Sequence, residues 1–215
     1  MGQVPAPEPF PFAMPSTASE WDEKHRRDAD AGSQDAAPIL CELNPLLPPG
    51  QSLDLACGRG GNAIFLAEQG RSVTAVDWST AALEILERDA RSRGVTVKRL
   101  GGKGPSVHPP SGIAAICADL ESFEFQAEEY SLVVCIRYLD RKLLNRIPQM
   151  LTPGGMALVE TYTTAQLSFH GGPRNPAYLL HPGELRHALP GLKLVFYREL
   201  RAGQGIATLL AAKPA

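Results

Sequence analysis

One segment constrains the fold of this chain more than any other. A short apolar stretch, residues 52–56, leads directly into a turn containing Gly58, Gly60 and Gly61, and Ala63 opens an apolar segment with helical spacing. Glycine allows a tight turn and lets the backbone approach a ligand closely, and the free N–H groups at a helix start attract anionic groups. The segment therefore predicts a strand, a turn and a helix of an α/β fold, with a ligand site at the turn.

The rest of the chain alternates between strand-like and helix-like segments. Expected strands are residues 52–56, 73–76, 113–117, 132–136, 156–162, 192–199 and 206–212; expected helices are 63–69, 79–93 and 143–151, with Pro148 bending or breaking the last. Such alternation predicts βαβ units and a parallel sheet covered on both faces. The link between the last two strands is too short for a crossover helix, so they must pair antiparallel. We expect an α/β, Rossmann-like three-layer sandwich with a mostly parallel seven-stranded sheet and one antiparallel strand near the C-terminus.

The two remaining kinds of segment are predicted to be irregular. Residues 1–18 contain five prolines, which remove backbone donors and fix φ, so we expect a disordered tail. Residues 100–112 are rich in glycine and proline and are expected to form a loop. The length of 215 residues suits one domain, which we place at residues 19–215.

Composition and cysteine spacing exclude several classes of protein. The chain has 21 Lys+Arg and 23 Asp+Glu, which is unlike a basic nucleic-acid coat or an acidic solvating protein. No apolar run reaches the roughly 18–20 residues of a membrane span. The cysteines, at positions 41, 57, 117 and 135, form no C-x-x-C, and no histidine pair has H-x-x-x-H spacing, so we expect reduced thiols and no metal site. The N-terminus does not read as a signal peptide, and we expect a cytoplasmic protein without membrane contact.

Two carboxylates follow later strands and strengthen the interpretation of the glycine turn. Asp77 ends the second expected strand, 19 residues after Gly58. An acid there can accept hydrogen bonds from both ribose hydroxyls and reject a 2′-phosphate. Asp119 follows the third strand, where it can accept from an adenine amine, with Leu120 packed near the ring. Each acid alone is equally typical of an ordinary turn, but three strand-end features in order indicate a nucleotide-cofactor site.

At this point the sequence resembles the class I, seven-strand S-adenosylmethionine-dependent methyltransferases. The residues that carry the resemblance are Asp54-Leu-Ala-Cys-Gly58-Arg-Gly60, Asp77, Ala118-Asp119 and Leu151-Thr-Pro-Gly-Gly155. Within that class the chain is similar to tellurite-resistance and thiopurine-type small-molecule methyltransferases. The segments concerned are Trp21-Asp-Glu-Lys-His25, Gly58-Arg-Gly-Gly-Asn62, Ile136-Arg-Tyr-Leu-Asp-Arg141 and residues 172–185.

The resemblance implies a role for each matching position. Asp54 and the glycines would hold the methionine end of S-adenosylmethionine, Asp77 the ribose, and Asp119 with Leu120 the adenine. Residues 19–47 would form an N-terminal lid, in which His25 stands where an aromatic residue is common, and residues 163–183 a substrate-side loop. The full expected cofactor set is Asp54, Cys57, Gly58, Gly60, Asn62, Asp77, Trp78, Asp119, Leu120 and Ile136, with Arg137 and Tyr138 positioning the acceptor.

The acceptor is predicted to be a small molecule. The fourth strand ends Cys135-Ile-Arg-Tyr138 and lacks the [DN]-P-P-[YF] sequence of methyltransferases that act on bases, and no basic surface interleaved with aromatic residues indicates nucleic acid. Arg137, Arg141 and Arg174 could receive an anion, or could equally be solvated surface residues. Glu160 and Tyr162 end the fifth strand and could face the acceptor. A thiol or a metalloid oxyanion fits these features and needs no strong general base.

Two other functions remain open from the sequence. Gly58, Gly60, Ala63 and Asp77 also satisfy the fingerprint of a nucleotide-cofactor (NAD) oxidoreductase, although no second substrate domain is evident. A catalytically silent cofactor-binding interaction protein is the other possibility. The sequence leaves the oligomeric state open.

Overall fold

The computed structural model describes residues 17–29, 34–101 and 111–215. Most of the expected proline-rich tail (residues 1–16) and most of the expected loop (residues 102–110) lie outside the described residues. The first described helix begins earlier than the tail was expected to end. Thr17 accepts from the Glu20 amide at 3.2 Å, and Glu20 accepts from the Thr17 amide at 3.1 Å, so a capping box starts the helix at residue 18.

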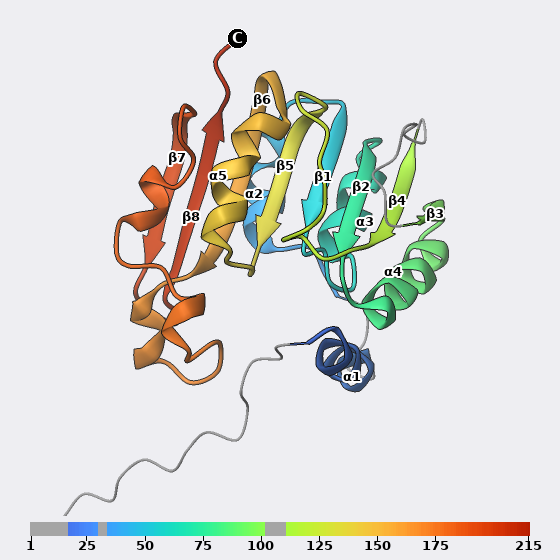
Figure 1. Cartoon of the computed structure of the whole chain (residues 1–215), viewed down its shortest axis with the longest axis horizontal. Coiled ribbons are helices and arrows are strands. Elements are labelled where there is room, and N and C mark those ends of the chain that lie inside the picture. The colour runs from blue at the N-terminus through green and yellow to red at the C-terminus, as the bar shows by residue number, and fades with distance from the viewer. Residues whose placement is uncertain (1–16, 30–33, 102–110) are drawn as a thin grey trace, which may run out of the picture.

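Eight strands form one sheet in the order β3-β4-β2-β1-β5-β6-β8-β7 (Figure 1). Their bounds are β1 Gln51–Leu55, β2 Ser72–Asp77, β3 Val97–Leu100, β4 Gly112–Cys117, β5 Tyr130–Ile136, β6 Leu151–Tyr162, β7 Lys193–Leu200 and β8 Ile206–Ala212. All neighbouring pairs from β3 to β6 are parallel, and β8 runs antiparallel to both β6 and β7. The expectation of a mostly parallel sheet with one reversed strand is confirmed.

The expected number of seven strands is wrong by one. The additional strand, β3, pairs with β4 at the edge of the sheet, and its last residue, Leu100, was assigned to the loop. Lys98 and Arg99 are exposed there, so β3 has no continuous apolar pattern. Pairing with β4 makes these residues a strand, and the sequence pattern alone gives little sign of that.

Helices cover the sheet on both faces, which gives the expected three layers. The α-helices are α1 Ala18–Ala29, α2 Pro38–Leu43, α3 Gly61–Glu68, α4 Thr80–Ser92 and α5 Arg141–Met150; the 3₁₀ helices are η1 Asn44–Leu46, η2 Thr164–Ser168, η3 Pro176–Tyr178 and η4 Glu184–His187. Apolar side chains of α2, α3 and α4 pack on one face of the sheet, and those of α5 and η4 pack on the other. Alternate residues of each central strand point into the two cores, so most residues of these strands are apolar, with buried polar exceptions such as Ser52, Asp54 and Thr74.

Two further α-helices, α4 and α5, also start with a side-chain cap. Ser79 caps α4 by accepting from the Ala82 amide at 3.1 Å, as predicted, and Asp140 caps α5 by accepting from the Lys142 amide at 2.8 Å. Pro148 does not break α5, which continues for two more residues to Met150. Pro148 therefore lies in the last turn, where a missing amide removes one hydrogen bond close to the point at which the helix ends anyway.

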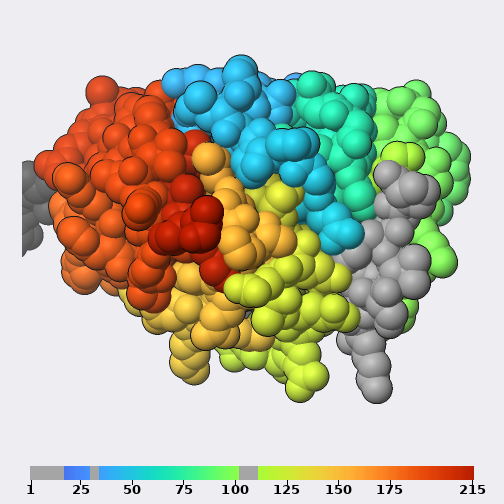
Figure 2. All heavy atoms as spheres, turned by 90° about the horizontal axis from the view of Figure 1, so that it is seen from above, coloured from blue at the N-terminus to red at the C-terminus, as the bar shows by residue number. Residues whose placement is uncertain are grey.

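The parallel strands all have their carboxyl ends at one edge of the sheet, called here the carboxyl edge, and their amino ends at the opposite edge. The parallel strands point toward the edge where α1 lies (Figure 1). Figure 2 shows the opposite edge, where the C-terminal segments in red, the β5 and β6 region in yellow to orange, and residues of the blue to cyan range lie side by side. Ligands of open α/β sheets bind at the carboxyl ends of the strands, which in this chain is the edge next to α1.

Candidate active site

The carboxyl edge brings together the strand-end residues that the sequence singled out. Asp54 is the penultimate residue of β1, and Asp77, Ile136 and Tyr162 are the last residues of β2, β5 and β6. These four strands are consecutive in the sheet order β2-β1-β5-β6. Parallel strands end at a common edge, so side chains separated by over 100 residues in sequence meet there.

The turn after β1 uses left-handed backbone three times. Ala56 has φ +53°, Gly58 +54° and Gly60 +83°. A Cβ on Gly60 would lie 2.3 Å from Cγ of Leu86, so close packing against α4 requires glycine at this position. The core therefore requires glycine at position 60 independently of any ligand, and the left-handed φ adds to the requirement. At Gly58 a Cβ would make ordinary contacts at 3.6 Å, so only the left-handed φ disfavours a side chain there.

Asp77 organises the turn through backbone amides. Its Oδ2 accepts from Gly58 N–H at 2.8 Å, and its Oδ1 accepts from Ser79 N–H at 2.9 Å. Burial raises the pKa of Asp77, and these two amide contacts oppose the rise. Asp77 thus joins the end of β2 to both the glycine turn and the start of α4. Each carboxylate oxygen retains a second lone pair for a ligand hydroxyl.

Asp54 is the least satisfied acid of the site. It is 1% exposed, and neither carboxylate oxygen accepts a hydrogen bond of ordinary geometry from the described residues. Burial and the nearby charge of Asp77 raise its pKa to about 8, and the Ala63 amide opposes this rise. A buried, unpartnered carboxylate is costly, and a ligand cation beside it would remove the cost. The α-ammonium of S-adenosylmethionine is a cation of this kind, so the residues present fit that cofactor.

The other expected cofactor residues occupy varied surroundings. Asn62 Oδ1 accepts from the Ala37 amide at 2.9 Å, so this side chain ties the segment before α2 to α3. Asp119 is exposed and accepts from the Glu121 amide at 2.9 Å, whereas Leu120 is buried in the core. Trp78 is half-buried directly after Asp77.

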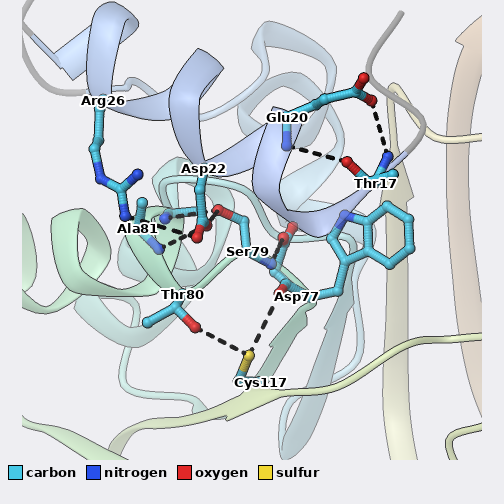
Figure 3. Close-up of polar contacts among 11 residues, drawn as sticks. Thr17, Glu20, Asp22, Arg26, Asp77, Ser79, Thr80, Ala81 and Cys117 are labelled. Atoms are coloured by element: carbon cyan, nitrogen blue, oxygen red, sulfur yellow. Dashed lines mark hydrogen bonds and ion pairs between the residues drawn. The ribbon is translucent and has the colours of Figure 1, made fainter.

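The cysteines are less uniformly buried than expected. Cys57 and Cys135 are buried, Cys117 is half-buried and Cys41 is exposed. Burial raises the pKa of Cys57 and raises that of Cys135 to about 12, so both thiols stay protonated and inert. Cys117 Sγ lies 3.5 Å from Thr80 Oγ1 and 3.4 Å from the Trp78 carbonyl (Figure 3), at the edge of the site.

Helix α1 lies over the glycine turn and is tied to α4. Asp22 Oδ1 accepts from Ser79 Oγ at 2.6 Å and from the Ala81 amide at 3.0 Å (Figure 3). Ser79 thereby links Asp22 of α1 to Asp77 of β2. The sequence did not single out Asp22 for this role, and its i,i+4 spacing from Arg26 gave the ordinary signal of a surface ion pair. Of the expected lid, residues 19–47, only α1 has this position, because α2 is part of the core.

Arg137, which follows β5, forms a cluster with Glu160 and Tyr162 at the end of β6. It has φ +64°, and its amide donates to the Glu160 carbonyl at 2.7 Å. Its guanidinium lies 4.9 Å from the centroid of the Tyr162 ring, donates to the Tyr162 hydroxyl at 2.5 Å, and has Nε 3.7 Å from Glu160 Oε1. Glu160 is 5% exposed and accepts from Thr208 at 2.7 Å. A strained backbone and a buried countercharge thus hold a half-exposed arginine at the strand ends. Thr208, on β8, had no sequence signal.

The other two arginines proposed for anion binding serve the chain itself. Arg141 forms a two-pronged ion pair with Glu184, at 2.6 and 3.1 Å, and donates to the Leu179 carbonyl at 3.1 Å. Arg174 donates to the carbonyls of Leu167 and Phe169, both at 2.7 Å. These contacts count against anion binding by Arg141 and Arg174, and anion binding by Arg137 stays a prediction. Tyr138 is half-buried, and burial raises its pKa, so its hydroxyl stays protonated.

The expected substrate-side loop is a structured segment. Thr163 pairs with Leu180 in a parallel bridge, and the Thr164 amide donates to the Leu180 carbonyl at 2.9 Å. Gln166 is 3% exposed; its Oε1 accepts from the Gly205 amide at 2.9 Å and its Nε2 donates to the Gly171 carbonyl at 3.0 Å. These contacts hold residues 163–183, which follow β6 and are called here the wall, in a fixed conformation through bonds within the chain.

Comparison with known proteins shows what part of this chain resembles. A family model described as a methyltransferase domain matches residues 53–155. The cypemycin N-terminal methyltransferase of Streptomyces sp. is 31% identical over 120 residues, which are 56% of this chain and 45% of that protein. The chain spans less than half the length of the curated relatives it matches, 45% and 43%.

Solved structures share the fold at low identity. TehB from Haemophilus influenzae has a TM-score of 0.66 and 17% identity, covering 88% of this chain and 67% of that one. The [4+2]-cyclase SpnF has a TM-score of 0.69 and 15% identity, covering 92% and 95%. An S-adenosylmethionine-dependent methyltransferase from Mesorhizobium loti has a TM-score of 0.60 and 18% identity, covering 83% and 99%.

These findings confirm the resemblance at the level of domain and fold. Residues 53–155 match the model of a methyltransferase domain, and they lie within a Rossmann-like α/β fold. More particularly, the chain has the fold of the S-adenosylmethionine-dependent class I methyltransferases, the TehB fold among them, and S-adenosylmethionine is the cofactor of that class. Among the described residues, no helix is long and apolar enough to cross a membrane.

Proposed function

We propose that this chain transfers a methyl group from S-adenosylmethionine to a small-molecule acceptor. The observation that carries the proposal is Asp54, a fully buried acid near the end of β1 whose carboxyl oxygens accept no hydrogen bond of ordinary geometry from the described residues. It lies in the segment that the methyltransferase-domain model matches. A site that leaves a buried acid unsatisfied is built for a cationic ligand group.

The expected cofactor residues are assigned to three parts of the ligand. Asp54, Cys57, Gly58 and Gly60 surround the amino-acid end, Asp77 the ribose hydroxyls, and Trp78, Asp119 and Leu120 the adenine, while Ile136 lies toward the donor methyl. Asn62 supports the site indirectly, since its side chain holds the Ala37 amide. The exposed carboxylate of Asp119 is accessible to an adenine amine.

Arg137 and Tyr138 are proposed to position the acceptor. Arg137 follows β5, the neighbour of β1, so it stands between the glycine turn and the wall formed by residues 163–183. Two of its five N–H groups are directed at Tyr162 and Glu160, and the rest are available to an anionic group. The ion pair with Glu160 reduces the positive charge, so a singly charged oxyanion or a thiolate fits better than a multiply charged anion.

The chemistry asks mainly for orientation. When bound, S-adenosylmethionine supplies the methyl group and the leaving thioether. The glycine turn and Asp77 fix one reactant, and Arg137, held by Glu160 and Tyr162, fixes the other, so that the two approach in line. Helix α1 and the wall of residues 163–183 exclude water from the pair. An acceptor that arrives as an anion needs no general base.

Three further considerations bear on the acceptor and the reaction. The motifs that resemble tellurite-resistance methyltransferases favour a metalloid or thiol acceptor, while the partial likeness to the cypemycin N-terminal methyltransferase names an N-terminal amine as the alternative to be tested. The fold likeness to a [4+2]-cyclase keeps a reaction other than methyl transfer in the test.

The NAD alternative receives no support from the positions of Tyr138 and Lys142. These residues have the Tyr-x-x-x-Lys spacing that some dehydrogenases place on one face of a helix. Here α5 is capped at Asp140, so Tyr138 precedes the helix and the pair does not share a helical face.

A labelled-methyl transfer screen over selenite, tellurite, thiols, phenols, amines, a peptide and RNA tests the proposal. We expect label in a small acceptor, and Arg137→Ala to reduce its transfer at least tenfold with unchanged binding of S-adenosylhomocysteine. Arg91→Ala, at an exposed position on α4, is the matched control. Transfer to peptide or RNA alone contradicts the small-molecule acceptor, and absence of any transfer despite cofactor binding contradicts methyl transfer itself.

A further inference from the structure

Helix α1 has no apolar face that would explain its position. Its sequence, ASEWDEKHRRDA, is polar almost throughout, and His25 is its only buried residue. A helix of this composition is ordinarily unstable on its own or lies free in solvent. Its position on the carboxyl edge therefore depends on particular contacts.

Those contacts join α1 to the two elements that form the cofactor site. Near its start, Asp22 accepts from Ser79 and Ala81 at the N-terminus of α4. At its end, Arg59 of the glycine turn donates through Nη1 to the Asp28 carbonyl at 2.7 Å. Between these two anchors, the helix places His25 against the turn.

The imidazole of His25 lies directly against Gly58. A Cβ on Gly58 would lie 3.6 Å from His25 Cε1, and the Trp21 ring stacks on the imidazole with centroids 5.5 Å apart. Neither ring nitrogen of His25 forms a hydrogen bond with a described residue, although the residue is 9% exposed. The imidazole is thus largely buried beside the turn, and no described residue bonds its nitrogens, which leaves them for a ligand.

The charges around His25 favour an anion. Lys24 of α1 and Arg59 of the turn are cationic, and the N-terminus of α3 begins at Gly61, two residues after Arg59. Asp22 and Asp28 face the ring from α1 itself. Burial first, and then Lys24 and Arg59, lower the pKa of His25 to about 4, so the ring is neutral at pH 7 and donates one hydrogen bond.

We propose that His25 donates a hydrogen bond to the carboxylate at the amino-acid end of S-adenosylmethionine, so that α1 completes the cofactor site. The proposal rests on the proposed function, which places that end of the cofactor at the glycine turn. Asp54 would hold the ammonium and His25 the carboxylate of the same amino acid, from opposite sides of the turn. The histidine thus does more than fill the space of an aromatic lid residue.

Two ligands that differ only at the amino-acid end separate these roles. S-Adenosylhomocysteine carries the carboxylate, whereas methylthioadenosine keeps the adenine, ribose and thioether and lacks it. The variant His25→Phe keeps an aromatic ring but removes the ring nitrogens. Calorimetry should show that it weakens the binding of S-adenosylhomocysteine about tenfold and that of methylthioadenosine less than twofold. Glu23→Gln, at an exposed position of α1, is the control and should leave both affinities unchanged.

The other outcomes overturn the proposal. Equal losses for both ligands would make His25 a packing residue, and no loss would remove it from the site. If His25→Phe fails to fold, the ring ¹⁵N signals of His25 in the parent protein decide, since they should shift with S-adenosylhomocysteine and stay unchanged with methylthioadenosine. If the parent protein binds neither ligand, the proposed function itself fails.

Discussion

Ala56 is a single residue with a backbone conformation that suits glycine better. Its φ of +53° costs an L-residue about 1–2 kcal/mol, and a glycine would avoid this at an entropic cost of about 0.5–1 kcal/mol. We therefore expect Ala56→Gly to raise the free energy of unfolding by about 0.5–1 kcal/mol, measured by urea denaturation.

The matched control for this substitution is Ala63→Gly. Ala63 is fully buried in helix α3, where glycine is unfavourable by about 1 kcal/mol and a methyl group is lost from the core. The two variants should change stability in opposite directions. Destabilisation by both would contradict strain at Ala56.

Asp54 gives the protein a specific dependence of stability on pH. Its pKa is raised from 3.8 to about 8, so between these values the folded state binds a proton that the unfolded state does not. The free energy of unfolding should consequently fall as pH rises from about 4 to 8. Asp54→Asn should remove this loss and be more stable than the parent at pH 8 by at least about 1 kcal/mol.

Urea unfolding at pH 5 and pH 8 checks the prediction, with Glu124→Gln, at an exposed position, as the control. The same Asp54→Asn variant should bind S-adenosylhomocysteine more weakly, because the ammonium loses its counterion. If the parent protein loses no more stability between pH 5 and pH 8 than the Asp54→Asn variant does, the carboxyl group of Asp54 already has hydrogen-bond partners in the folded state.

At the scale of the element, α1 should undock from the site in acid. The pKa of His25 falls from 6.5 in the undocked helix to about 4 when docked, since burial, Lys24 and Arg59 outweigh Asp28 and Asp22. Because the docked state excludes the proton, docking is fully favoured above pH 6.5 and is lost as pH falls through 4.

Acrylamide quenching of Trp21, in a Trp78→Phe background, measures the position of α1. Trp21 stacks on His25, so its quenching should be greater at pH 5 than at pH 7. In the His25→Phe variant this difference should disappear. Equal quenching of Trp21 at both pH values in the parent background would show that the docking of α1 does not depend on the titration of His25.

At the scale of the whole molecule, cofactor binding should stabilise the fold by mass action. S-Adenosylhomocysteine at about 100 times its Kd should raise the free energy of unfolding by about 2.7 kcal/mol, which is about 5–11 °C in Tm for a chain of this size. NAD at the same concentration should shift Tm much less. A larger Tm shift with NAD than with S-adenosylhomocysteine would favour the hypothesis of an oxidoreductase over that of a methyltransferase.

Much of this architecture follows from the sequence alone. Local patterns determine the parallel strands, the Ser79 cap and the reversed C-terminal pair, because apolar periodicity, caps and link lengths act over a few residues. Motif order likewise identifies the edge where Asp54, Asp77 and Arg137 gather, because parallel strands all end at the same side of a sheet. The edge strand β3 has no such local pattern and depends on its partner β4.

Tertiary structure alone decided which of the candidate polar residues bond to other parts of the fold. Arg141 and Arg174 look like Arg137 in the sequence, yet they bond to Glu184 and to backbone carbonyls that lie elsewhere in the chain or across a loop. Gly60 is required by Leu86 of α4, a contact across 26 positions. Such assignments depend on distances between segments remote in sequence, which local propensity and composition do not encode. For the same reason the sequence marks His25 only as an unusual lid residue, because its position against Gly58 depends on how α1 packs on the turn.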